Sequence, residues 1–320
     1  MITGIIDSAC QQGFLYAVAV FGIVFTLRFL NWPDLTVDGS FTLGGAVLAR
    51  MLLAGYSPWS SMVFAGLAGF IAGTITFLLN RKLGISKIMS GILVMLVLYS
   101  INLRIMGRAN LSLLRTTTFF TRFEDRGVGD PIRIAVFLGI LLIVLIGLCY
   151  FVMTRIGLFL RATGDNEFMV QGLGVNTNFL FLIGLGLSNG LVAISGALVA
   201  QNQGFADVSM GTGLIITGIA ALILGEGLFS AFASIRKRVL SRQTDVLSGS
   251  SGLHLLPWSS FGEIVAAAVG AFVYFLIVAI CLRIGLAPTD LKLATGVLVI
   301  VAVALQKQHT GAETYARGRL

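Results

Sequence analysis

Residues 155–178 read RIGLFLRATGDNEFMVQGLGVNTN and separate two long uncharged runs, at 134–153 and 179–199. Each run has about the 20 apolar residues that are needed to cross the hydrocarbon core of a bilayer. The stretch between them carries Arg155, Arg161, Asp165 and Glu167, whose charges are costly in lipid. We therefore expect residues 155–178 to lie outside the membrane, between two spans.

The composition of the whole chain is that of a polytopic membrane protein. Hydrophobic residues make up 57% of the 320 residues and charged residues only 11%, whereas soluble globular domains have about 25% charged residues. The 39 glycines suit transmembrane helices that approach each other closely. The sequence thus predicts an all-α integral membrane fold, a bundle of about 8–10 transmembrane helices, some of them short or broken.

The apolar runs give about nine candidate spans. A short span follows the polar stretch 31–40, and another is rich in glycine. The nine are 14–30, 41–54, 59–79, 85–103, 132–153, 179–201, 211–229, 263–282 and 291–305.

Lysine and arginine predict the orientation, because cytoplasmic loops carry an excess of both. One side of the nine-span topology collects Arg28, Arg81, Lys82, Lys87, Arg155, Arg161, Arg236, Lys237, Arg238, Arg242, Lys307, Arg317 and Arg319. Taken as cytoplasmic, this side places the N-terminus outside and the C-terminus inside. A basic loop at 104–133 then lies outside, so either the count is wrong by one or this loop serves a partner or an anionic ligand, which we favour.

Two short stretches predict an inverted repeat. Residues 38–44 (DGSFTLG) resemble residues 207–213 (DVSMGTG), and each precedes a short glycine-rich apolar segment. The topology puts the first copy inside and the second outside, as in transporters that build a midplane site from interrupted helices. Chance similarity in a glycine-rich chain is the alternative.

Polar residues in or beside the apolar segments are candidates for a translocation path, since such groups usually face a cavity or each other. They are Asp38, Ser40, Thr42, Asn102, Arg104, Asp207 and Glu226. Arg104 could hold a substrate carboxylate or form a salt bridge with Asp207. Ser40 and Thr42 could line the path or satisfy backbone groups at a broken helix. Glu226 could pair with a basic residue at the cytoplasmic end of its span.

A short helix is expected within residues 155–178. Asp165 or Asn166 could cap it, and Gly174 could end it after Leu173. Residues 168, 169 and 173 would then form one apolar stripe. This helix either lies on the lipid surface or fits a cleft on a cytoplasmic motor protein.

Other chemistry is not indicated. The sequence has no GxxxxGK[ST], HExxH or GxSxG motif, and its three cysteines have no metal-ligand spacing. The net charge of +8 is assigned to cytoplasmic loops rather than to nucleic-acid binding. We therefore expect no enzyme, no metal and no cofactor in this chain.

A resemblance to a known family rests on four stretches. RATGDNEFMVQGLGVN (161–176) resembles the cytoplasmic loop of ABC importer permeases of the branched-chain amino acid and ribose type, which run R-A-x-x-x-N and then G-[IV]-N. Its matching positions are Arg161, Ala162, Asn166, Gly174, Val175 and Asn176. VDGSFTLGGA (37–46), YSINLRIMGRAN (99–110) and LAPTDLKLAT (286–295) are similar to permeases of tryptophan/tyrosine-type uptake systems.

This resemblance implies one transmembrane permease domain over residues 1–320, in a bacterial inner membrane. It implies a second copy of the permease, an ABC ATPase subunit that binds ATP and Mg, and an extracytoplasmic solute-binding protein. The solute would be small, with aromatic amino acids favoured. Residues 155–178 would be the coupling segment, with coupling residues Arg161, Asp165, Asn166, Glu167, Gly174 and Asn176.

The sequence departs from the expected pattern at residues 230–260, a long polar segment predicted as a cytoplasmic loop. It could be loosely packed, contact the ATPase or regulate it, or be attracted to anionic lipid. Two other functions also stay open. An ion-coupled secondary transporter could use Asp38, Asp207 and Glu226 as ion sites, and a membrane scaffold would transport nothing.

Overall fold

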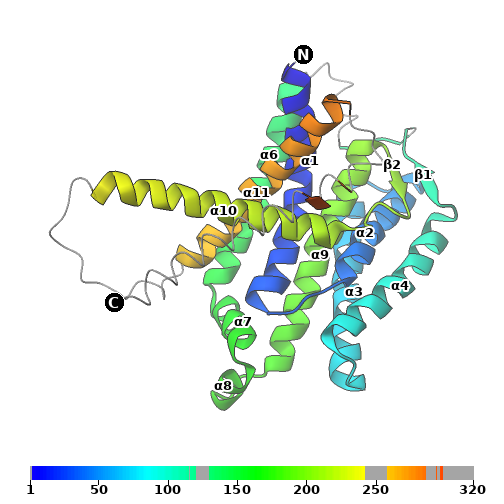
Figure 1. The fold of residues 1–320 in the computed structure, drawn as a ribbon. Helices are drawn as coiled ribbons and strands as arrows, with labels where there is room; N and C mark the ends of the chain where they lie inside the picture. The colour runs from blue at the N-terminus through cyan, green and yellow to red at the C-terminus, as the bar shows by residue number, and fades with distance from the viewer. Residues whose placement is uncertain are drawn as a thin grey trace. The chain divides into compact units, whose positions relative to one another are not determined.

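The computed structural model describes residues 2–114, 116–119, 130–241, 258–285, 293, 296 and 297. The described chain is almost entirely helical (Figure 1), which confirms the all-α prediction. The chain divides into two compact units, Phe14–Gly218, and Met1–Gly13 with Ile219–Leu320.

Helices account for almost all the regular structure of the described residues. The helices are α1 (Ile2–Val24), the π-helix η1 (Phe25–Phe29), α2 (Thr36–Leu53), α3 (Pro58–Leu83), α4 (Lys87–Met106), α6 (Asp130–Met153), α7 (Arg155–Asp165), α8 (Glu167–Gly172), α9 (Thr177–Gln203), α10 (Leu214–Ser241) and α11 (Trp258–Arg283). Strands β1 (Asn110–Ser112) and β2 (Phe205–Asp207) form an antiparallel ribbon in which Leu111 faces Ala206.

Six helices in the described part of the chain are long and apolar enough to cross a membrane. They lie at Ala9–Phe29, Pro58–Leu83, Lys87–Met106, Ile134–Met153, Thr177–Gln203 and Gly262–Arg283, and a shorter apolar stretch covers Leu214–Phe229. Every predicted span from 14–30 to 263–282 overlaps a helix. The span predicted at 291–305 lies outside the described residues, as do residues 242–257 of the predicted loop.

Several predicted boundaries are wrong. Helix α1 begins at Ile2 rather than at residue 14, and α2 begins at Thr36, inside the stretch predicted as a polar loop. Helix α10 continues to Ser241, so residues 230–241, which were predicted as part of a loop, are helical. A hydropathy pattern marks only the apolar part of a helix, so the polar turns at the helix ends are not predicted.

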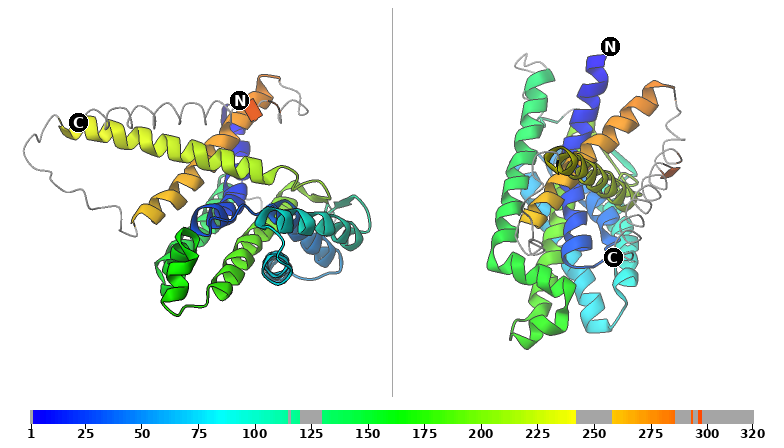
Figure 2. Two further views of the ribbon diagram at one scale, coloured as in Figure 1. Left: turned by 60° about the horizontal axis from the view of Figure 1, so that its bottom comes forward. Right: turned by 60° about the vertical axis from the view of Figure 1, so that its left-hand side comes forward.

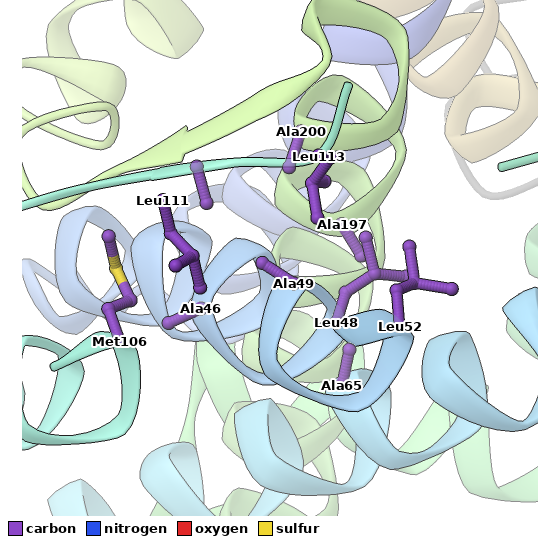
Figure 3. Packing of buried hydrophobic residues seen from close by; sticks show 11 residues of the cluster. Ala46, Leu48, Ala49, Leu52, Ala65, Met106, Leu111, Leu113, Ala197 and Ala200 are labelled. Atoms are coloured by element: carbon purple, nitrogen blue, oxygen red, sulfur yellow. The ribbon is translucent and has the colours of Figure 1, made fainter. Parts of the chain in front are cut away.

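Helix α2 forms the centre of the larger unit. It packs against α3, α4 and α9 and against both strands, and its side chains are almost all buried between Thr36 and Ala49. Figure 3 shows Leu48 and Ala49 of α2 beside Ala65 and Ala197, with Leu111 of β1 above. A helix buried on all sides needs no polar face, which explains the lack of a clear amphipathic pattern in this segment.

Glycine allows α2 and α9 to cross with their backbones in contact. A Cβ atom on Gly44 would lie 1.9 Å from the carbonyl oxygen of Ala193, and one on Gly196 would lie 1.9 Å from that of Phe41. Small residues at helix crossings are typical of membrane proteins. In the other unit α10 and α11 cross in the same way (Figure 2), with Gly225 against Ala266 and Gly270 against Ala221.

The larger unit has two distinct ends. Helices α7 and α8 precede the start of α9, whereas the β1–β2 ribbon lies at its far end (Figure 1). Arg81 and Lys87 lie at the first end, and Arg104 and Arg108 lie at the opposite end of α4 from Lys87. The two groups of basic residues therefore lie at opposite ends, and which end faces the cytoplasm stays a prediction.

Candidate functional site

Residues 155–178 form two short helices separated by one residue. Thr154 caps α7, because its Oγ1 accepts a hydrogen bond from the Gly157 N–H at 3.3 Å. Asn166 caps α8, because its Oδ1 accepts a hydrogen bond from the Met169 N–H at 3.1 Å. Gly174 follows α8 with φ +80°. The predicted cap at Asn166 and end at Gly174 are confirmed, whereas α7 was not predicted, although Thr154 is a typical N-cap residue.

Both short helices are fixed to the membrane helices by buried contacts. Leu160 of α7 and Val170 of α8 are fully buried. Gly164 brings α7 against η1 so closely that a Cβ atom there would lie 2.1 Å from the Phe29 carbonyl oxygen. The two helices are therefore a packed part of the unit rather than a loose linker.

Glu167 joins three helices through one carboxylate oxygen. Its Oε1 forms a salt bridge with Arg81 at the end of α3. The same oxygen accepts hydrogen bonds from Gln171 Nε2 at 3.2 Å and from Thr177 Oγ1, at the start of α9, at 3.1 Å. Side chains on α3 and α9 thus hold the first turn of α8.

The outer face of α8 is apolar and exposed. Phe168 is 83% exposed, Met169 55% and Leu173 66%, although Val170 on the same helix is buried. The predicted stripe is therefore present on the surface. This face can dock against a partner protein or enter the lipid surface.

The other predicted coupling residues have different surroundings. Asp165 is exposed. The Arg161 guanidinium lies 5.9 Å from the centre of the Phe29 ring. Asn176 caps α9, where its Oδ1 accepts hydrogen bonds from the Asn178 and Phe179 N–H groups. The structure thus brings the predicted residues together around α7 and α8, and their coupling role stays a prediction.

The predicted path residues Asp38 and Thr42 meet the start of α10. Asp38 Oδ2 accepts a hydrogen bond from the Gly213 N–H at 2.9 Å, and Oδ1 accepts one from the Ile215 N–H at 3.0 Å. Thr42 Oγ1 accepts a hydrogen bond from the Gly211 N–H at 3.1 Å. The two stretches predicted as a repeat therefore contact each other, and Thr42 satisfies a backbone N–H group in the turn before α10.

Asp34 is a buried polar residue that the sequence analysis missed. Its Oδ1 accepts a hydrogen bond from the Thr36 N–H at 2.9 Å, and its Oδ2 accepts one from Asn189 Nδ2 of α9 at 2.7 Å. Ser40 Oγ donates to Asn189 Oδ1 at 2.7 Å, and the Thr36 and Thr76 hydroxyls are bonded at 2.7 Å. This network ties the start of α2 to α3 and α9. An aspartate two residues before a helix start was the available signal.

The predicted path residues at the ribbon end are also engaged. Asp207 Oδ1 accepts hydrogen bonds from the Ser209 N–H and hydroxyl, and Oδ2 accepts one from Asn110 Nδ2. Burial raises the pKa of Asp207, but these hydrogen bonds outweigh it, so the pKa lies below its usual value. The suggested pairing of Asp207 with Arg104 is replaced by these contacts, and Arg104 is exposed.

Asn102 is buried on α4 and donates from Nδ2 to the Gly39 carbonyl oxygen of α2 at 3.2 Å. Its Oδ1 has no hydrogen-bond partner among the residues that the structure describes. Glu226 lies within α10, near the end of the apolar stretch Leu214–Phe229. The path residues are thus spread over the junction of α2 with α10, the α2–α4 contact and the ribbon, and not gathered in one cluster.

Comparison with known proteins agrees with this architecture. The family model described as branched-chain amino acid transport system / permease component matches residues 5–304. The tyrosine transport system permease protein of Clostridioides difficile (strain R20291) is 36% identical over 303 residues, 95% of this chain and 91% of that protein. The uncharacterized protein RP368 of Rickettsia prowazekii (strain Madrid E) is 33% identical over 306 residues, 95% of this chain and 99% of that one.

A more distant relative is the ribose import permease protein RbsC of Escherichia coli (strain K12). It is 24% identical over 267 residues, 81% of this chain and 80% of that protein. No solved structure matches the chain. The matched region covers all the helices described above except the first few residues of α1. The chain belongs to the permease family of branched-chain amino acid transport systems, and is a multi-pass membrane subunit for transport.

Proposed function

We propose that this chain is the permease subunit of an ATP-driven importer of a small amino acid-type solute, with aromatic amino acids favoured. The name of the relative from Clostridioides difficile, a tyrosine transport system permease protein, supports this solute class. The ribose permease relative belongs to the same family with a different solute, so family membership alone does not select an amino acid. The proposed location is a bacterial inner membrane, with α7 and α8 on the cytoplasmic side.

The observation that carries the proposal is an exposed apolar patch at α8, a helix that is held in place by side chains of α3 and α9. Phe168 and Met169 on α8 and Leu173 directly after it are exposed, and an exposed apolar patch is typical of a protein interaction site. Glu167 on the same helix is tied to Arg81 and Thr177. A partner protein that binds this apolar patch therefore acts on α3 and α9 at the same time.

Helix α9 would transmit a movement of α8 into the membrane. It has 27 residues, which corresponds to about 40 Å at 1.5 Å per residue. It contacts the buried helix α2 along the Gly44–Gly196 crossing. Closure of an ATPase dimer against α8 would be transmitted to α2 through this contact, and two permease copies would switch between inward-facing and outward-facing states.

The proposal assigns ATP and Mg to a separate ATPase subunit and initial solute capture to an extracytoplasmic binding protein. The ATPase supplies the chemistry of hydrolysis, and this chain binds the ATPase and moves the solute. The competing ion-coupled transporter is less well supported, because both carboxylate oxygens of Asp38 already accept backbone hydrogen bonds.

Reconstitution separates the two functions. Vesicles that contain only this chain should take up no labelled amino acid under a proton or sodium gradient. Vesicles with the chain, its ATPase and its binding protein should take up solute when Mg-ATP is present on the ATPase side. Gradient-driven uptake by the chain alone would overturn the proposal in favour of a secondary transporter.

A further inference from the structure

Residues 211–215, which lead into α10 and include its first residues, are attached to α2 by three hydrogen bonds from backbone to side chain. Asp38 accepts two of them, from the Gly213 and Ile215 N–H groups, and Thr42 accepts the third, from Gly211. All five residues lie within the unit Phe14–Gly218. The attachment is therefore a property of one compact unit.

These bonds solve a problem that arises when a helix begins inside a membrane protein. The first N–H groups of a helix have no hydrogen-bond acceptor within the helix. Inside a membrane protein, little water is available to accept these hydrogen bonds instead. The helix start also carries a partial positive charge, which a carboxylate stabilises. Asp38 supplies both the acceptor oxygens and the negative charge to α10 from a different helix.

Close backbone packing adds to this attachment. A Cβ atom on Gly211 would lie 2.0 Å from the Asp38 carbonyl oxygen and 2.7 Å from Thr42 Oγ1. Gly213 has φ +86°, in the left-handed region that favours glycine. Both glycines therefore allow residues 211–213 to lie directly against α2 before α10 begins.

We infer that Asp38 and Thr42 are positioning residues, which fix the start of helix α10 against α2, and that Asp38 is not a ligand for solute or ion. The inference rests on the proposed function insofar as α2 and α10 belong to the translocation path. It gives Asp38 a different role from the ion site that a secondary transporter would require.

Graded substitutions at Asp38 test the inference. Asn keeps one acceptor oxygen and is a good helix cap, whereas Ala keeps none. We expect the maximal uptake rate of the complete transport system to fall in the order wild type, D38N, D38A. The loss in D38A should be roughly tenfold or more, with the half-saturating solute concentration unchanged.

Thr42 offers a milder pair of variants in case D38A fails to fold. T42S keeps the hydroxyl acceptor for Gly211, whereas T42V removes it with little change in shape, so T42S should transport better than T42V. A matched control is T74V, because the Thr74 hydroxyl donates to the Phe70 carbonyl oxygen of its own helix and so does not join α2 to α10. T74V should transport better than T42V.

A second measurement does not depend on transport. Thr212 is exposed between Gly211 and Gly213. A cysteine there, in a chain whose Cys10, Cys149 and Cys281 are replaced by serine, can be labelled with a small water-soluble maleimide. Loosening of the start of α10 should speed labelling in D38A and T42V, less so in D38N, and not in T74V.

The outcomes separate the possible roles. Equal loss of uptake in D38N and D38A, with unchanged labelling of T212C, would show that the charge itself binds solute or ion and would overturn the inference. If the graded labelling appears but uptake proves independent of an ATPase, the proposed function fails while the positioning role stands.

Discussion

Within the coupling segment, Gly174 is the residue whose backbone conformation most clearly requires glycine. Its φ of +80° costs a residue with a Cβ atom roughly 1–2 kcal/mol. We expect G174V to impair ATP-driven uptake in whole cells, while G174N keeps more of it, because Asn tolerates this conformation. Gly172 is a matched control, since a Cβ atom there meets nothing within 4 Å. Equal effects of G174V and G172V would contradict this role of Gly174.

The salt bridge between Glu167 and Arg81 is the residue-level link from α8 to α3. Each single charge reversal, E167R or R81E, should uncouple ATP hydrolysis from uptake, and the double reversal should restore part of the coupling. Partly exposed pairs contribute only about 0.2–1 kcal/mol, so the chain should stay folded in all three. The measurement is ATP hydrolysed per solute taken up in reconstituted vesicles.

Asp165 provides the contrast for this pair, because it is exposed. D165K should weaken ATPase association without lowering the thermal stability of the purified permease.

A double reversal at positions 81 and 167 that performs no better than the single variants would argue that Glu167 contacts the partner directly and not through α3.

At the scale of the element, the two faces of α8 should respond differently to truncation. V170A removes buried methyl groups and should destabilise the chain by about 2 kcal/mol. F168A removes an exposed ring and should leave stability unchanged while it reduces copurification of the ATPase. Thermal unfolding and copurification from detergent measure the two effects, and an F168A chain that retains its ATPase fully would contradict the docking role.

The short helix in the coupling segment could be predicted because its signals are local. Asn166 and Gly174 are cap and stop residues that act on their own backbone. The start of α2 could not, because Thr36 and Ser40 are satisfied by Thr76 and Asn189, which are distant in sequence. Polar residues that look like a loop thus become part of a helix when another helix supplies their partners.

The repeat hypothesis is modified at the element scale. Asp34 accepts a hydrogen bond from the N–H of Thr36, and Asp207 accepts one from that of Ser209, two residues on in each case. Each turn precedes an apolar helical stretch, α2 in the first case and Leu214–Phe229 of α10 in the second. Asp34 and Asp207 thus share the same hydrogen-bonding pattern. The sequence resemblance between residues 38–44 and 207–213 instead paired Asp207 with Asp38. The inverted repeat itself stays a prediction.

At the scale of the whole molecule, α9 connects the two ends at which partners are proposed to act. The coupling helices lie at its start and the β1–β2 ribbon at its end (Figure 1). The exposed Arg104 and Arg108 lie at the ribbon end, where the proposed binding protein would arrive. Opposite charge on that protein would attract it to this end, and association should weaken as salt is raised.

Site-specific photocrosslinking can show whether a soluble ATPase binds this chain at α8. Phe168 on α8 is 83% exposed, and Leu114 at the ribbon end is 84% exposed, so a photoreactive amino acid at either site is similarly accessible. The account predicts a crosslink to the ATPase from position 168 and none from position 114. A crosslink to the ATPase from position 114, with none from position 168, would contradict it.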